Sequence, residues 1–155
     1  MTYKISGLEP SQFRHLVGLS DEQLAAHNAA RIIADKDRGF PCRVTLEDAP
    51  AGESLILLHY TSHDVTTPYR SSYAIFIREK ADMPAVFEDR TPPVFEGRPL
   101  GLRGFGADGN LKNALLALPS EADAKIRELL ADPAIAYIDA HNAAHGCFAA
   151  RVERS

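Results

Sequence analysis

The sequence predicts an α+β fold with a mainly antiparallel sheet, two helices near the N-terminus and one helix near the C-terminus. Apolar residues recur with a period of two in several segments that are separated by turn residues, which indicates strands joined as hairpins. Helical spacing marks two regions, one before residue 40 and one after Ser120. Helices and strands therefore fall into separate runs along the chain, and such segregation is typical of α+β proteins.

The N-terminal region predicts a short strand followed by two helices. Residues 3–8 alternate weakly between apolar and polar side chains, as a strand does. Pro10 suits the first turn of a short helix, whose apolar face would come from residues 13–17. Ser20 and Gln23 have the spacing of a capping box. A second helix is therefore expected to start at Ser20 and to continue through Ile33.

The middle of the chain predicts a hairpin and a third strand. From Cys42 to Glu47 the apolar period changes to two, residues 48–52 supply a turn, and residues 55–63 form the second arm. The first part of that arm, Leu55 to Leu58, is apolar on both faces, which predicts a central position in the sheet. Residues 73–78 give the third strand.

The C-terminal half predicts an irregular loop, a second hairpin, a helix and a closing pair of strands. The loop is rich in proline and carries apolar side chains that need burial. The second hairpin is indicated by the turn residues Asp108-Gly109, although its second arm also has helical spacing. In chain order these are the loop 82–99, strands 100–105 and 111–118, a helix from Ser120 to about Leu130, and strands 135–140 and 147–152.

Size, charge and cysteine content narrow the class of protein. The 155 residues fit a single domain, 1–155, which is long enough to bury a core without a disulfide or a metal. The net charge of −4 argues against a nucleic-acid partner, which would select a basic face. No apolar run reaches the roughly 18 residues of a membrane span, so no membrane partner is expected. Two cysteines are too few for a disulfide framework and predict a reducing cytoplasm.

Seven short motifs are spread over nearly the whole chain. They are Phe40-Pro41-Cys42-Arg43, Asp48-Ala49-Pro50-Ala51-Gly52-Glu53, Leu57-Leu58-His59-Tyr60, Pro68-Tyr69-Arg70, Ile75-Phe76-Ile77-Arg78, Leu102-Arg103-Gly104-Phe105 and Asn142-Ala143-Ala144-His145-Gly146-Cys147-Phe148. With these motifs the chain resembles a bacterial family of uncharacterised proteins, domain of unknown function 1203. The family usually has Ser-Gly-Pro where this chain has Ser72-Tyr73-Ala74, which changes any turn there. The resemblance implies the domain limits and a bacterial origin, and it implies no activity.

The two cysteines are the first candidates for chemistry. Cys42 stands beside Arg43 at the start of the predicted hairpin, and Cys147 opens the last predicted strand. If these segments are neighbours, both thiols lie near guanidinium groups, and a nearby cation favours the nucleophilic thiolate. The competing interpretation is that each thiol is a small buried hydrophobe. The candidate catalytic residues are Cys42 as the nucleophile and His59 as the base, with His63, His141 and His145 as alternative bases.

Arginines in or beside predicted strands are the candidates for ligand binding. A guanidinium group binds a carboxylate or a phosphate through two parallel hydrogen bonds, so convergent arginines would form a site for a small anionic ligand. The alternative is that they form structural ion pairs with Glu47, Asp48, Glu53 or Asp139. The candidate ligand-binding residues are Arg43, Tyr69, Arg70, Arg103, Cys147 and Arg151.

No cofactor and no metal is expected. His141 and His145 flank three residues that would fit a tight turn, and two imidazoles with Asp64 or Cys147 would suit zinc. However, the chain has no compact ligand motif such as Cys-x-x-Cys. The glycines between residues 104 and 109 also lack the spacing of a phosphate-binding loop.

Two functional hypotheses follow. The first is a small-molecule site, enzymatic or purely binding, in which Cys42 supplies a thiolate, Arg43 or Arg70 holds an anionic ligand, and a histidine carries a proton. The second is a non-enzymatic homodimeric interaction module, whose contacts come from the loop 92–95 and an exposed sheet edge. The first hypothesis requires that the Cys42 segment and the last strand meet in the fold.

Overall fold

Strands dominate the computed structural model, which describes residues 2–155. Its regular elements in chain order are β1 (Tyr3–Ser6), α1 (Asp21–Ala26), β2 (Ala29–Ile33), β3 (Ser54–His63), β4 (Ser71–Arg78), β5 (Val86–Glu88), β6 (Leu100–Phe105), β7 (Leu111–Ala117), α2 (Ala122–Leu130), β8 (Tyr137–Asn142) and β9 (Phe148–Arg154). Three short 3₁₀ helices, η1 (Pro10–Gln12), η2 (Arg14–Leu16) and η3 (Pro93–Phe95), complete the elements of the described chain.

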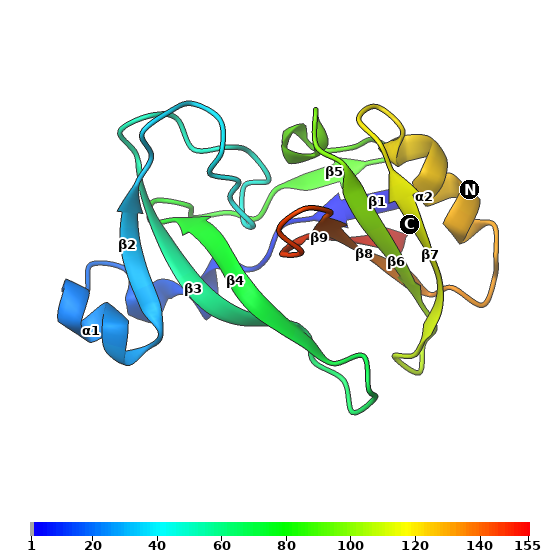
Figure 1. Ribbon diagram of the computed structural model, residues 1–155, viewed down its shortest axis with the longest axis horizontal. Coiled ribbons are helices and arrows are strands. Elements are labelled where there is room, and N and C mark those ends of the chain that lie inside the picture. Colours follow the sequence, from blue (N-terminus) through cyan, green and yellow to red (C-terminus); the bar gives the residue numbers. More distant parts are fainter. Residues whose placement is uncertain (1) are drawn as a thin grey trace.

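Two antiparallel sheets stand side by side (Figure 1). The larger has strand order β5-β1-β9-β8-β6-β7, and the smaller has order β2-β3-β4. Each pairing of named strands in residues 2–155 is antiparallel. The predicted α+β class with mainly antiparallel pairing is therefore confirmed, although the strands are divided between two sheets. The central position predicted for the arm that forms β3 is also confirmed.

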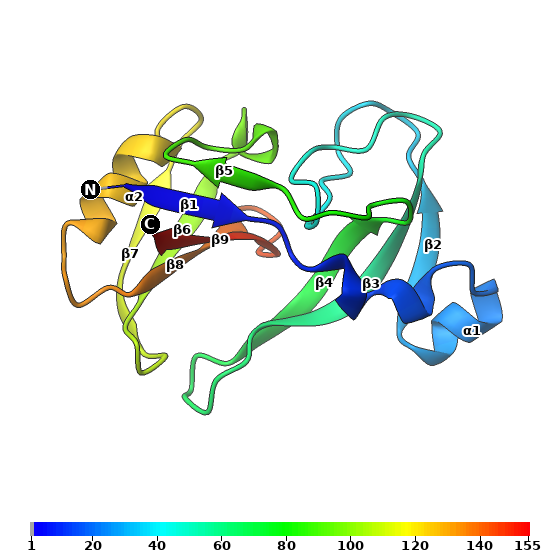
Figure 2. The same ribbon diagram turned by 180° about the vertical axis from the view of Figure 1, so that it is seen from behind.

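The first predicted helix does not form as an α-helix. Its residues make η1 and η2 instead, which are single 3₁₀ turns. Phe13 and Leu16 are buried against the smaller sheet, whereas Val17 is 44% exposed, so the expected apolar face is only partly realised. Seen from behind, this segment lies in front of the smaller sheet, and α1 lies beside β2 at the edge of that sheet (Figure 2).

The second helix begins where the sequence predicts but ends earlier. Ser20 accepts a hydrogen bond from the N–H of Gln23 at 3.2 Å, and the Gln23 side chain accepts one from the N–H of Ser20 at 2.9 Å, which confirms the capping box. Asn28 then adopts φ 55°, a left-handed conformation that ends helices. The prediction of a helix through Ile33 is wrong, because the residues after Asn28 pair with β3 as strand β2.

The segment from Cys42 to Glu47 is a tight loop and not the first arm of a hairpin, so that prediction is wrong. The N–H of Cys42 donates to the carbonyl of Glu47 at 2.9 Å, and the N–H of Leu46 donates to the carbonyl of Cys42 at 3.0 Å. Leu46 has φ 56°, which an extended chain does not allow. The alternation that suggested a strand reflects burial of Cys42, Val44 and Leu46 inside the loop.

The C-terminal half follows the prediction closely. The hairpin β6–β7, the helix α2 and the closing pair β8–β9 all form, and α2 packs its buried side chains against the larger sheet. The proline-rich loop contains β5 and η3. Val94 and Phe95 are each 3% exposed, as the need for burial predicted. Val94 and Phe95 therefore pack inside the protein, whereas Pro93 is exposed, and the dimer contact predicted for the loop 92–95 stays a prediction.

A hydrophobic cluster joins the two sheets. Phe148 at the start of β9 packs with Ile75 and Ile77 of β4 and with Cys42. This contact fixes the β8–β9 turn against the smaller sheet, so both walls of the candidate site rest on packed strands. No helix among residues 2–155 combines the length and the apolarity needed to cross a membrane.

Candidate functional site

Arg43 connects the Cys42 loop to the start of β9. Its Nε donates to the carbonyl of Phe148 at 2.7 Å, its Nη1 to the carbonyl of Pro41 at 2.6 Å, and its Nη2 to Sγ of Cys147 at 3.1 Å. The side chain is buried. The prediction that the Cys42 segment and the last strand meet is confirmed, and the group that joins them is a guanidinium.

This buried guanidinium has no carboxylate partner within 4.0 Å in the described chain. Buried charges are normally paired, because an isolated ion loses its hydration without compensation. Burial lowers the pKa of the Arg43 guanidinium, and the neighbouring Cys147 acts in the opposite direction. Among the described residues, Cys147 is the ionisable side chain that accepts a hydrogen bond from Arg43.

The β8–β9 turn brings a second donor to this sulfur. Asn142 Nδ2 donates to Sγ of Cys147 at 3.3 Å. The turn is closed by the N–H of Gly146, which donates to the carbonyl of Asn142 at 2.8 Å, and Gly146 has φ 80°, where a side chain would be strained. The tight turn that the sequence suggested between the two histidines is thus present. The amide of Asn142 in this turn and the guanidinium of Arg43 in the Cys42 loop therefore donate to the same sulfur.

Cys147 lines a hollow of about 510 Å³ between the β8–β9 turn, β4 and the Cys42 loop, which we call the Cys147 hollow. Its wall is largely apolar and contains no Asp or Glu among the described residues. Arg98 also lines it, but both of its terminal nitrogens are held by the carboxylate of Asp48, at 2.6 and 2.9 Å. The wall consists of Gly39, Pro41, Arg43, Leu57, Tyr73, Ala74, Phe76, Arg98, Pro99, Asn142, Ala143, Ala144, His145 and Cys147.

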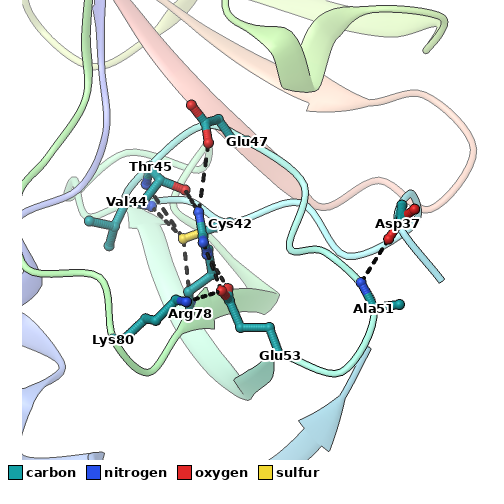
Figure 3. A network of polar contacts seen from close by, with 9 residues as sticks. All are labelled: Asp37, Cys42, Val44, Thr45, Glu47, Ala51, Glu53, Arg78 and Lys80. Atoms are coloured by element: carbon teal, nitrogen blue, oxygen red, sulfur yellow. Dashed lines mark hydrogen bonds and ion pairs between the residues drawn. The ribbon is translucent and has the colours of Figure 1, made fainter. Parts of the chain in front are cut away.

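Cys42, in contrast to Cys147, does not line the hollow. Its side chain is 1% exposed, and its sulfur accepts hydrogen bonds from the backbone N–H groups of Val44, Thr45 and Arg78 at 3.3 to 3.4 Å. Figure 3 shows the sulfur enclosed among these groups, beside the ion pair between Arg78 and Glu53. The competing interpretation, a small buried thiol that completes the packing, describes this position.

His59 lies on the opposite face of β3 from Cys42. It is exposed and lines a shallow depression with Leu57 and Ala74, two residues that also line the Cys147 hollow. Cys42 packs with Leu58, whose side chain points to the opposite face because neighbours in a strand alternate. The structure therefore does not bring the predicted base to the predicted nucleophile.

A second hollow, of about 460 Å³, lies beside the first and shares Tyr73 and His145 with it; we call it the Arg103 hollow. Arg70 and Arg103 both line it, as the prediction of convergent arginines requires. Arg70 is tied to Asp64 at 3.2 Å, but both side chains are more than half exposed, so the pair is weak.

Tyr69 and Arg151 stand outside both hollows. The carbonyl of Tyr69 accepts a hydrogen bond from Nδ1 of His63 at 2.9 Å. Arg151 donates to both carboxylate oxygens of Asp139, at 2.7 and 3.0 Å, and lies over the ring of Tyr137. For Arg151 the alternative of a structural ion pair is confirmed. No group of three or more His, Cys, Asp or Glu in residues 2–155 is arranged to hold a metal.

Sequence reasoning did not select Asn142 as a site residue. It stood inside the motif 142–148, but a lone asparagine in a turn gives no signal of what its amide will contact. The contact arises only because the turn folds back on Cys147.

A family model described as a protein of unknown function, DUF1203, matches residues 39–154. The match covers most of the chain and includes both hollows, and the chain belongs to this family. No curated protein and no solved structure matches the chain.

Proposed function

We propose that this protein binds a small molecule in the Cys147 hollow and that the thiolate of Cys147 is its reactive group. One observation carries the proposal: Arg43 is buried, has no carboxylate partner among residues 2–155, and donates to Sγ of Cys147 at 3.1 Å. A thiolate there gives the guanidinium its counter-charge and is the nucleophilic form of cysteine. The amide of Asn142 is a second donor to this sulfur, and hydrogen bonds to a charged group stabilise its charged form.

The chemistry that this arrangement supports is nucleophilic attack on an electrophilic carbon of the bound molecule. An S–C bond forms, and the electron pair of the bond that breaks goes to the departing atom. Arg43 and Asn142 orient the sulfur. His145 lines the same hollow, and we assign to it the transfer of a proton to the departing atom.

These roles differ from those first assigned from the sequence. Cys147 replaces Cys42 as the nucleophile, and His145 replaces His59 as the proton carrier. Arg43 donates one N–H from each of its three nitrogens, to two backbone carbonyls and to Cys147, so we assign it to the thiol and assign an anionic ligand to other residues. A reducing bacterial cytoplasm suits the proposal, because both cysteines are free and the thiol has to stay reduced.

The test is the rate of alkylation by iodoacetamide at pH 7, with the modified residue located by peptide mapping. Free cysteine is only about 3% thiolate at this pH, so a stabilised thiolate should react about tenfold faster, after allowance for its lower intrinsic nucleophilicity. Cys147 should be labelled first, and Cys42 only after unfolding. A rate for Cys147 at or below that of free cysteine would refute the proposal.

A substitution beside the sulfur gives an independent check. Asn142→Asp replaces a donor by a negative charge and should slow alkylation of Cys147 about tenfold. Asn113→Asp makes the same charge change at an exposed position of β7 and should leave the rate unchanged. Equal alkylation rates in both variants would contradict the role of Asn142. If either variant folds poorly, alkylation and peptide mapping of the unmodified chain still test the proposal.

A further inference from the structure

The Arg103 hollow contains a cation that the rest of the described chain leaves without a partner. Arg103 lies on β6 and is partly buried, yet its side chain forms neither a hydrogen bond nor an ion pair with residues 2–155. Its nearest strand neighbour of opposite charge is Asp139, directly across in the β6–β8 register. Asp139 is fully buried and accepts hydrogen bonds from Arg151 on both carboxylate oxygens, so it is paired with Arg151 and not with Arg103.

The wall around Arg103 is made of donors. No Asp or Glu lines the hollow among the described residues, whereas hydroxyl groups and imidazoles do. An oxyanion prefers such surroundings, since guanidinium and hydroxyl groups donate to its oxygens and no carboxylate repels it. The lining consists of Tyr60, Ser62, Arg70, Ser71, Ser72, Tyr73, Ile75, Arg103, His141, His145, Gly146 and Phe148.

His141 adds a lone pair to this donor-rich wall. It is buried, and its Nδ1 lies 2.9 Å from the carbonyl of Gly146, which only accepts, so the proton sits on Nδ1 and Nε2 is left as an acceptor. Burial, assisted by Arg103, lowers the pKa of His141, although the carbonyl of Gly146 and Asp139 act in the opposite direction. Nε2 of neutral His141 can accept a hydrogen bond from a protonated oxygen, as in hydrogen phosphate, and a protonated imidazole can donate to a carboxylate.

We propose that the Arg103 hollow binds the oxyanion group of a small molecule, a phosphate or a carboxylate, with Arg103 as the principal contact and Arg70, His141 and the serine hydroxyls completing the site. The volume of about 460 Å³ exceeds that of the oxyanion alone, so the rest of the ligand has room inside it. The site stands whether or not Cys147 is reactive. Tyr73 and His145 line both hollows, so a ligand held here extends toward the thiol.

The test is titration with inorganic phosphate at constant ionic strength, followed by NMR on the full chain, with sodium malonate and sodium chloride as separate arms. Phosphate or malonate should shift the amide signals of residues 71–73 and 146, and chloride should not. A response to phosphate alone assigns a phosphate group, and one to malonate alone assigns a carboxylate. No response to either oxyanion would overturn the proposal.

Two variants with the same change of charge locate the site. Arg103→Gln should weaken binding tenfold or more, because it removes a charged donor with no other partner to lose. Arg90→Gln removes an exposed arginine that stacks on Phe87 outside the hollow, and it should bind as the unmodified chain does. Equal weakening in both variants would overturn the assignment, because it would indicate general electrostatic attraction.

A readout on the unmodified chain does not depend on any variant. A bound oxyanion should raise the pKa of His141, since a nearby negative charge favours the imidazolium. The titration of its ring signals with and without phosphate measures this, and an unchanged pKa under saturating phosphate would refute the contact. Cys147→Ser should bind phosphate as before, which separates this site from the reactivity of the thiol.

Discussion

Glu79, directly after β4, accepts hydrogen bonds from β2 and β3. Its substitution should therefore lower the free energy of unfolding by a large and pH-dependent amount. Arg31 on β2 donates to its two oxygens at 2.5 and 2.9 Å, the N–H of Gly18 donates at 3.2 Å, and the hydroxyl of Ser54 donates as well. Only 15% of the Glu79 side chain is exposed. The smaller sheet forms one wall of both hollows, so this carboxylate supports the site from a distance.

The size of the effect follows from the pKa. The hydrogen bond from Arg31 is the main cause that lowers the pKa of Glu79 from 4.5 to about 2. At about 1.4 kcal/mol per pH unit, the native contacts favour the charged carboxylate by about 3 kcal/mol. Glu79→Gln removes the charge and turns an amide donor toward other donors, so we expect a loss of about 2 to 3 kcal/mol in the free energy of unfolding at pH 7.

The pH dependence separates ionisation from simple loss of contacts. Between about pH 4.5 and pH 2 the unfolded chain binds a proton at Glu79 that the native chain does not, so native stability falls as the pH falls through this range. The glutamine side chain of the variant cannot titrate. The difference in the free energy of unfolding between the two proteins should therefore narrow as the pH drops from 7 toward 3.

Urea unfolding measured at several pH values between 3 and 7 provides the assay. The slope of the free energy of unfolding against urea concentration should be the same for both proteins, because the same surface is exposed on unfolding. If the two stability curves ran parallel over the whole pH range, the cost of Glu79→Gln would not come from the charge, and the reasoning would be refuted.

Two further predictions concern packing and assembly. A Cβ at Gly7 would lie 1.9 Å from the carbonyl oxygen of Val44, so Gly7→Ala should lower the free energy of unfolding by about 3 kcal/mol and disturb the loop that carries Arg43. A Cβ at Gly101 would meet no atom within 4 Å, so Gly101→Ala should change this free energy by less than about 1 kcal/mol. Thermal unfolding compares the two variants, and equal losses would contradict the packing argument. The homodimer stays a prediction that light scattering decides, and a monomer at millimolar concentration would argue against it.

The sequence by itself determined most of the strands. Alternation along β3, β4 and β6, together with the turn at Asp108-Gly109, depends only on neighbours in the chain, and those elements form where predicted. The capping pair Ser20 and Gln23 is equally local and formed as expected. Where a segment's state depends on a distant partner, local pattern was insufficient: residues 29–33 became a strand because β3 was available to pair with them.

For the candidate site, the sequence supplied the residue types and their approximate places, but the fold decided which of them meet. It placed Cys42 in a nest of backbone N–H groups and left Cys147 on the wall of a hollow, although both are cysteines near arginines in the chain. It bound Arg151 to Asp139 and left Arg103 unpaired among the described residues.

The physical reason is one of range. Strand and helix patterns arise from interactions over a few residues, which a linear sequence displays directly. The environment of a thiol or a guanidinium is set by groups that lie 104 residues away, as in the contact between Arg43 and Cys147, and only the tertiary structure brings such groups within hydrogen-bond distance.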